Sequence, residues 1–150
     1  MRLMTSMGIL ETGQTIDGYK IQNILGQGGM GAVYKATQVS MQRDVALKVL
    51  SPELAERDPS FCKRFIEEAR AAGRLNHPNI IAVHDVSQTT IDDETIYYFV
   101  MELVEGDDCK FLLKKHGRLD RELVGSIVSA VADVLVYAEQ CNIVHRDIKP

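Results

Sequence analysis

Several features that would place a chain in another class are scarce in this sequence. Only three cysteines occur among 150 residues, and they lie far apart. None belongs to a Cys-x-x-Cys pair or has a histidine nearby at zinc-ligand spacing. We therefore interpret Cys62, Cys109 and Cys141 as reduced structural thiols, typical of a reducing compartment.

Long apolar runs and clusters of positive charge are also missing. The longest apolar stretch, Ile127–Ala138, contains Asp133 and is shorter than the about 20 residues that cross a bilayer. Residues 1–6 lack the apolar core of a signal peptide, so we expect a cytoplasmic location. This expectation is compatible with a longer parent chain that carries a membrane anchor after this region. The net charge is −4 and no run of Lys or Arg is present, which argues against nucleic acid as a partner.

What is present indicates a folded domain or two small lobes. Apolar residues make up 45% of the chain and charged residues 25%, as in ordinary globular proteins. Residues 1–17 show little pattern and are expected to be a loosely held lead-in. The remainder predicts a mostly β region and then a mostly α region, with the change near residues 102–107.

Five extended segments joined by short connections predict an antiparallel sheet. A helix is expected between the third and fourth strands, because Asp58 is a good N-cap and Pro59 suits the first helical position. It is expected to end near Leu75, before Pro78. The expected strands are 19–25, 32–38, 44–50, 80–87 and 96–101, with a polar loop over 88–95, and the later helices are 109–115 and 120–140. The fold class is α+β.

The segment from Gly26 to Gly31 has the spacing Gly-x-Gly-x-x-Gly between two predicted strands. Alone, this pattern is compatible with a flexible hairpin turn, and dinucleotide-binding domains share it. Those domains need a helix directly after the glycines, whereas Ala32–Gln38 is rich in β-forming residues and is followed by another strand. The arrangement favours a hairpin whose backbone N–H groups can approach phosphate oxygens.

Two charged residues lie where apolar ones are expected. Lys48 is the only charge within Val45–Leu50, and a buried ammonium needs a partner unless its side chain reaches the surface. Glu68 lies on the predicted inward stripe of the helix, where an apolar residue is expected, and the alternative is a solvated charge on the helix surface. We expect Lys48 and Glu68 to form an ion pair. The stripe consists of Phe61, Phe65, Glu68, Ala72 and Leu75.

The end of the chain adds a third motif, His145-Arg146-Asp147-Ile148-Lys149-Pro150. Together with the glycine segment, Val45–Lys48 and Glu68, it resembles the signature set of the protein kinases, in the right order. The resemblance covers about residues 18–150 and is strongest to bacterial members of the eukaryotic-type Ser/Thr kinases. It implies an ATP-binding N-lobe over 18–101 with five antiparallel strands and one helix, a hinge over 102–107, and the start of an α-helical C-lobe over 108–150.

The resemblance also implies roles for single residues. The glycine segment would cover the ATP phosphates, Lys48 would hold the α- and β-phosphates, and Glu68 would fix that lysine. Met101 would lie at the back of the adenine pocket, with Glu102 and Val104 on the adenine edge and Asp108 near the ribose. The implied ATP-binding residues are Leu25, Gly26, Gln27, Gly28, Gly29, Met30, Gly31, Val33, Ala46, Lys48, Met101, Glu102, Val104 and Asp108.

For the reaction itself, the resemblance implies that Asp147 orients the hydroxyl group of a substrate Ser or Thr and that Lys149 neutralises charge on the γ-phosphate. Arg146 would meet a phosphorylated activation loop. The family's Mg²⁺ ligands would come after Pro150, so no metal ligand is expected within this chain. We therefore expect a complete parent to be an ATP- and Mg²⁺-dependent Ser/Thr kinase, and the chain alone to be inactive.

Two other functions stay open from the sequence. The chain could be a non-catalytic, kinase-like binding module that docks on a kinase or another partner through the apolar stripe of Leu123–Ala138, and a kinase–kinase dimer is one form of this. A nicotinamide-dependent dehydrogenase is disfavoured by the strand that follows the glycines.

Overall fold

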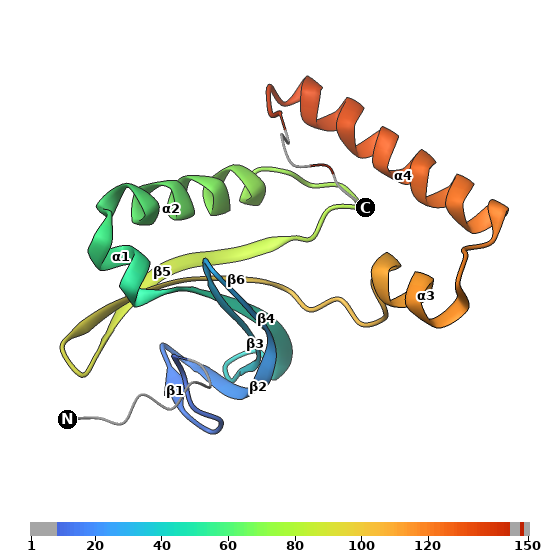
Figure 1. Cartoon of the computed structure of the whole chain (residues 1–150). Helices are drawn as coiled ribbons and strands as arrows, with labels where there is room; N and C mark the ends of the chain where they lie inside the picture. The colour runs from blue at the N-terminus through green and yellow to red at the C-terminus, as the bar shows by residue number, and fades with distance from the viewer. Residues whose placement is uncertain (1–8, 145–147, 149–150) are drawn as a thin grey trace. The chain divides into compact units, whose positions relative to one another are not determined.

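The computed structural model of the chain describes residues 9–144 and 148. The chain divides into two compact units (Figure 1). The first comprises Met1–Arg74 and Ala82–Leu103, and the second comprises Leu75–Ile81 and Val104–Pro150. The first unit holds all the strands of the described residues and the second holds two helices, so the predicted α+β class is confirmed.

The first unit is built on a six-stranded antiparallel sheet with the strand order β1-β2-β3-β4-β6-β5. Five strands correspond to the predicted ones, and the sixth, β1, is a two-residue strand that the sequence did not suggest. The strands are β1 (Thr15–Ile16), β2 (Tyr19–Gly28), β3 (Gly31–Gln38), β4 (Arg43–Leu50), β5 (Val83–Ile91) and β6 (Glu94–Glu102).

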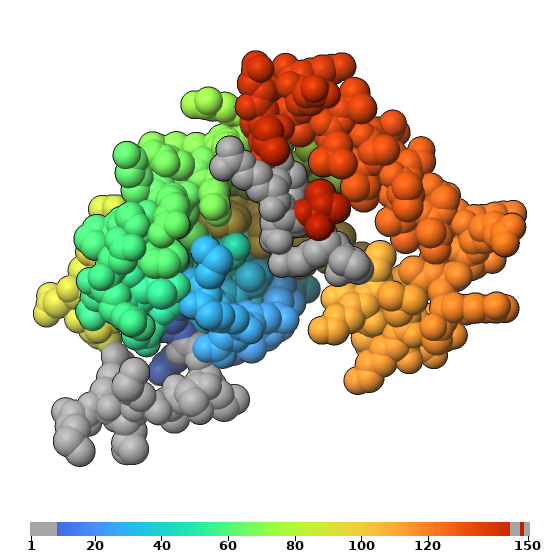
Figure 2. All heavy atoms as spheres, turned by 45° about the horizontal axis from the view of Figure 1, so that its top comes forward, coloured from blue at the N-terminus to red at the C-terminus, as the bar shows by residue number. Residues whose placement is uncertain are grey.

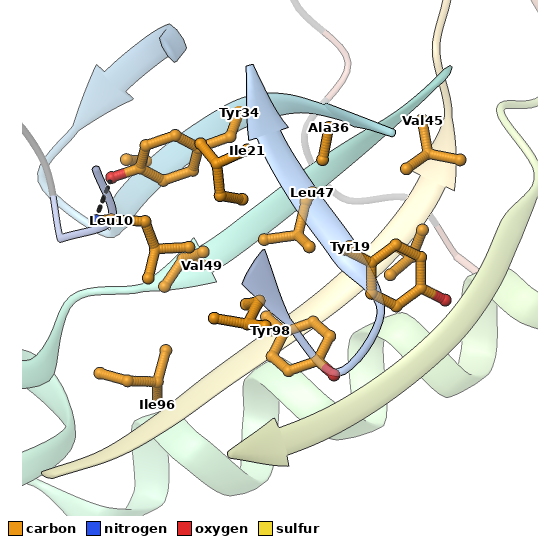
Figure 3. Close-up of a cluster of buried hydrophobic side chains, with 13 residues drawn as sticks. Leu10, Tyr19, Ile21, Tyr34, Ala36, Val45, Leu47, Val49, Ile96 and Tyr98 are labelled. Atoms are coloured by element: carbon orange, nitrogen blue, oxygen red, sulfur yellow. Dashed lines mark hydrogen bonds between the residues drawn. The ribbon is translucent and has the colours of Figure 1, made fainter. Parts of the chain in front are cut away.

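One face of this sheet carries the hydrophobic core, which Figure 3 shows. Alternate residues of β3, β4 and β6 point into it, among them Tyr34, Leu47 and Val100, each at most 2% exposed. Leu10 and Ile16 complete the core, and the Tyr34 hydroxyl accepts hydrogen bonds from the backbone N–H groups of Ile9 at 2.7 Å and Leu10 at 3.1 Å. The expectation of a loosely held lead-in is therefore wrong for residues 9–17.

Two helices follow β4, α1 (Pro52–Arg57) and α2 (Pro59–Gly73), of which only α2 was predicted. The Asp58 side chain accepts a hydrogen bond from the Ser60 N–H, as expected for an N-cap. Helix α2 packs against β5 and β6, and the ring of Phe65 lies 5.1 Å from that of Phe99. The helix ends two residues earlier than predicted, which is within the usual uncertainty of a helix end.

Strands β5 and β6 extend into the segment that was predicted to be a polar loop over 88–95. Ile91 pairs with Glu94, which leaves a two-residue turn at Asp92 and Asp93. Both turn residues have positive φ angles, 50° and 67°, as a tight hairpin of matching twist requires. Aspartate tolerates this conformation, so the acidic segment forms the tip of a hairpin. The predicted start of β5 at residue 80 is also wrong, since the strand begins at Val83.

The second unit contains α3 (Cys109–His116) and α4 (Arg121–Gln140), both close to their predicted bounds. Asp120 caps α4 by accepting hydrogen bonds from the N–H groups of Glu122 and Leu123. After α4, Asn142 has a φ of 58°, the left-handed conformation that ends many helices. The Tyr137 hydroxyl accepts a hydrogen bond from the Asn76 N–H at 3.0 Å, which ties residues 75–81 to α4.

Within residues 9–144 and 148, no helix combines the length and the apolar character needed to cross a membrane. The cysteines Cys62, Cys109 and Cys141 are all free thiols.

Candidate functional site

The glycine segment forms the tip of the β2–β3 hairpin. Gly28 pairs with Gly31, and the register shifts between Ile24 and Gly26, which leaves Leu25 as the extra residue of a β-bulge. Leu25 and Met30 are 49% and 48% exposed. The hairpin therefore presents two apolar side chains and a glycine-rich backbone to solvent.

Gly31 is required by the fold itself. Its φ is 142°, and a Cβ atom there would lie 1.9 Å from the carbonyl oxygen of Val49 on β4. The neighbouring Met30 carbonyl accepts a hydrogen bond from the Ser51 N–H at 3.0 Å. No other residue fits at position 31 without moving β3 away from β4.

Gly26, Gly28 and Gly29 differ from Gly31 in that nothing lies within 4 Å of the place where a Cβ would be. These three glycines are not needed for packing within the described residues. Their effect is to leave the backbone of the hairpin tip uncovered, so that a ligand as bulky as a phosphate chain can come close to the N–H groups.

The sheet face opposite the core continues from this hairpin. Since Val45, Leu47 and Val49 point into the core, Ala46 and Lys48 point to the opposite face. The strand register places Val33 beside Lys48, and Met101 beside Ala46. A small apolar surface and one lysine thus lie on the same sheet face, next to the glycine hairpin.

Lys48 is half-buried, and its Nζ lies 5.5 Å from the centre of the Phe99 ring, its cross-strand neighbour. Such a contact stabilises a cation by the negative face of the ring. The same ring touches Phe65 of α2. Phe99 therefore links Lys48 to α2. It was not among the predicted site residues, although its place on β6, two residues before Met101 and on the same face of the strand, could have indicated it.

The predicted ion pair between Lys48 and Glu68 is not formed. The structure describes both residues, Glu68 is exposed, and no ion pair joins them. The side of α2 that meets the sheet carries Phe65 and Ala69, 3% and 2% exposed, so the buried stripe is rotated from the predicted one. Glu68 lies about 60° from Phe65 around the helix, at the border of the buried side.

A polar cluster on the same sheet face was also missed. Lys35 Nζ lies 2.9 Å from Asp44 Oδ2, and Asp44 Oδ1 accepts hydrogen bonds from Gln22 at 2.7 Å and Thr37 at 3.1 Å. The pKa of Asp44 is lowered mainly by the hydrogen bond from Lys35. The hydrogen bond from Thr37 lowers this pKa further, by a smaller amount. The sequence could have predicted this polar cluster. Side chains alternate between the two faces along a strand, which places Lys35 and Thr37 of β3 on the same face as Val33.

The remaining predicted residues lie in different places. Glu102, at the end of β6, donates its N–H to the Ala82 carbonyl at 2.8 Å, and Val104 and Asp108 belong to the second unit. Asp108 accepts a hydrogen bond from the Phe111 N–H at 2.6 Å as the N-cap of α3. Three predicted residues, Arg146, Asp147 and Lys149, lie outside the described residues.

No group of three metal-ligating side chains is present in the part of the chain that the structure describes. The expectation that the chain itself supplies no Mg²⁺ site stays a prediction.

Comparison with known proteins places this geometry in a family. The family model described as protein kinase domain matches residues 19–150. A probable serine/threonine-protein kinase of Streptomyces coelicolor is 43% identical over 132 residues, which cover 88% of this chain and 20% of that protein. The serine/threonine-protein kinase PrkC of Bacillus subtilis is 39% identical over 139 residues, 92% of this chain and 21% of that protein.

Solved structures agree with the sequence matches. The crystal structure of the PknI kinase domain of Mycobacterium tuberculosis has 37% sequence identity and a TM-score of 0.77, and the match covers 94% of this chain and 55% of that one. The chain thus spans about a fifth of the length of these curated relatives and somewhat more than half of a solved kinase domain. The chain belongs to the protein kinase domain family.

Proposed function

We propose that the complete protein transfers the γ-phosphoryl group of ATP to a Ser or Thr hydroxyl group of a protein substrate, and that this chain supplies the nucleotide-binding part. The observation that carries the proposal is the uncovered glycine hairpin beside an apolar sheet face with one lysine. The family and the names of the relatives support the same activity.

In this proposal the backbone N–H groups of residues 26–31 bind the phosphates from one side, and Lys48 binds the α- and β-phosphates as a point charge. Val33, Ala46 and Met101, with Leu25 of the bulge, contact the adenine ring. Glu102 and Val104 supply backbone groups for its edge, and Asp108 is a candidate for the ribose hydroxyl groups while it also caps α3.

Lys48 needs to leave the Phe99 ring and meet Glu68 in the active arrangement. Since α2 carries Glu68 at the border of its buried side, a rotation or shift of α2 would bring Glu68 to Lys48, and the helix position would then control activity. Asp147 would orient the substrate hydroxyl, Lys149 would neutralise the γ-phosphate and Arg146 would bind a phosphorylated loop. Mg²⁺, when bound, neutralises charge on the β- and γ-phosphates, and its ligands are proposed to follow Pro150.

The first test is nucleotide binding by the chain. A fluorescent ATP analogue should bind, and Lys48→Met should weaken binding by about tenfold or more, because a charge-assisted contact contributes ~1.5–3 kcal/mol. Lys20→Met, a change of an exposed lysine on β2, is the matched control and should bind like the unchanged chain. Equal affinities for Lys48→Met and the unchanged chain would contradict the assignment of Lys48.

The second test concerns phosphoryl transfer. The complete protein should incorporate radiolabelled phosphate into a Ser- or Thr-containing protein, and Asp147→Asn should reduce the rate strongly without loss of ATP binding. The chain alone should show no transfer. Robust transfer by the chain alone would contradict the proposed need for Mg²⁺ ligands beyond Pro150.

A second candidate function, a kinase-like binding module, is favoured by one observation. Helix α4 exposes apolar side chains along its length, of which Val128 is 61% exposed and Leu135 39%. If the chain acts as a module, or as part of a kinase–kinase dimer, light scattering after size-exclusion chromatography should give one species of defined stoichiometry. A broad distribution of aggregates would speak against it.

A further inference from the structure

The arm of β2 that leads into the glycine hairpin is held by the sheet on one side only. Among the described residues, β1 and the residues before it hydrogen-bond to β2 only as far as Ile21, and beyond that point β2 pairs with β3 alone. This pairing is interrupted by two register shifts, one between Ile21 and Asn23 and one between Ile24 and Gly26. A bulge leaves its extra residue unpaired and disrupts the ladder locally. The position of this arm therefore depends on other interactions.

The exposure of the arm limits what packing can contribute. Every residue from Asn23 to Gly28 is exposed, and in Figure 2 the light-blue atoms of the β2–β3 hairpin form part of the surface. The β3 arm differs, because Gly31 lies against β4 and the Met30 carbonyl accepts a hydrogen bond from the Ser51 N–H. Packing therefore fixes the β3 arm of the hairpin more firmly than the β2 arm.

A set of polar side chains joins the β2 arm to β3 and β4 at its first bulge. Gln22, the extra residue of that bulge, is half-buried and donates hydrogen bonds to the Thr37 hydroxyl and, at 2.7 Å, to Asp44. Thr37 donates in turn to Asp44, and Lys35 forms an ion pair with the same carboxylate. Hydrogen bonds to an ionised acceptor are stronger than neutral ones. We name Gln22, Lys35, Thr37 and Asp44 the bulge clamp.

The bulge that the clamp holds decides which sheet face Leu25 occupies. Tyr19 and Ile21 point into the core, and plain alternation along β2 would send Leu25 to the same face. One extra residue reverses the alternation. The bulge at Gln22 therefore places Leu25 on the face opposite the core, which it shares with Val33, and there it is 49% exposed. Both residues belong to the proposed nucleotide site.

We propose that the bulge clamp positions Leu25 and the glycine hairpin for nucleotide binding, with Gln22 as its central positioning residue. The clamp acts through the backbone of β2, whose glycine segment begins four residues after Gln22, and it makes no contact with the nucleotide itself. Without the clamp, the β2 arm moves away from the sheet more often, and the phosphate-binding N–H groups and Leu25 lose their fixed places. The consequence for binding rests on the proposed ATP-binding function, whereas the holding of the hairpin does not.

Hydrogen exchange tests the clamp without any nucleotide. Gln22→Leu keeps a side chain of similar size and removes the amide. Exchange of the backbone amides of residues 23–31, measured by mass spectrometry of the full chain, should become about three- to tenfold faster, because hydrogen bonds that oppose local opening are lost. The matched control, Gln38→Leu, removes the hydrogen bond from Arg43 between β3 and β4 and leaves the clamp intact. It should not change exchange at 23–31. Unchanged exchange in Gln22→Leu overturns the proposal.

Nucleotide affinity separates positioning from general stability. A fluorescent ATP analogue should bind Gln22→Leu about three- to tenfold more weakly than the unchanged chain, while Gln38→Leu binds normally. The two variants should have similar urea midpoints. An equal loss of affinity in both variants, or fast exchange at the hairpin with normal affinity in Gln22→Leu, would show that the clamp does not position the nucleotide site. If the unchanged chain binds no ATP analogue, the proposed function fails, and the exchange experiment still decides whether the clamp holds the hairpin.

Thr37 allows a rescue and a double-variant comparison. Thr37→Val removes the hydroxyl group and should weaken the ATP analogue as Gln22→Leu does, whereas Thr37→Ser keeps the hydroxyl group and should bind like the unchanged chain. Because Gln22→Leu and Thr37→Val remove the same hydrogen bond, the double variant should bind little more weakly than the weaker single variant. Losses that multiply in the double variant, or a Thr37→Ser chain as weak as Thr37→Val, would contradict a clamp made by these hydrogen bonds.

Discussion

The glycine hairpin provides the sharpest prediction about stability, because one of its glycines is needed for packing and the others are not. In Gly31→Ala, the new Cβ would lie 1.9 Å from the Val49 carbonyl oxygen, and the φ of 142° is one that residues with a side chain rarely adopt. Strain of this kind costs about 1–3 kcal/mol. Separation of β3 from β4 near the hairpin would also remove the hydrogen bond between Ser51 and Met30, about 1 kcal/mol.

The expected loss is therefore about 2–4 kcal/mol of the free energy of unfolding of the first unit. It can be measured by urea denaturation followed by far-ultraviolet circular dichroism, with the midpoint compared at equal slope. Because the chain has two compact units, the transition of the β-rich unit needs to be separated from that of the helical unit, for example by hydrogen exchange of β3 and β4 amides.

The control is Gly29→Ala, at a position with open space around it and no positive φ. It should cost less than about 1 kcal/mol. If nucleotide binding is weakened in Gly29→Ala while stability is kept, the open glycines serve the ligand, as proposed. A Gly31→Ala chain as stable as Gly29→Ala would refute the reasoning on the contact between β3 and β4.

Three further changes test single interactions. Tyr98→Phe removes the 2.6 Å hydrogen bond from the Tyr98 hydroxyl to Asp17 and should lower the unfolding free energy by about 1 kcal/mol, seen as a lower urea midpoint. Lys35→Met should raise the pKa of Asp44 toward its ordinary value in a carboxyl NMR titration. Since the folded-state pKa is lowered, the stability from Asp44 is present above its unfolded pKa of about 3.9 and is lost as the pH falls through the folded pKa, so the variant should lose less stability on acidification. Asp120→Ala should destabilise α4 by ~1 kcal/mol and lower its helical signal, because the N-cap acceptor is lost; an unchanged signal would contradict a capping role.

Features that depend on neighbours in the chain could be read from the sequence. Asp58 and Asp120 mark the starts of α2 and α4, because a capping carboxylate acts on N–H groups only two or three residues away. Asn142 ends α4 in the left-handed conformation for a similarly local reason. The glycine spacing indicated the hairpin and, with Lys48, the place of the candidate site.

Features that depend on residues far apart in the chain were decided only by the tertiary structure. Residues 9–16 looked patternless, since their burial depends on Tyr34, which is 24 residues after Leu10. The orientation of α2 was mispredicted because Phe65 and Glu68 both suit an inward stripe, and the choice is made by the contact of Phe65 with Phe99 on another strand. Local pattern specifies where a helix or strand begins and which residues are apolar, whereas the packing of one element on another selects the side that is buried and the charge that is left exposed.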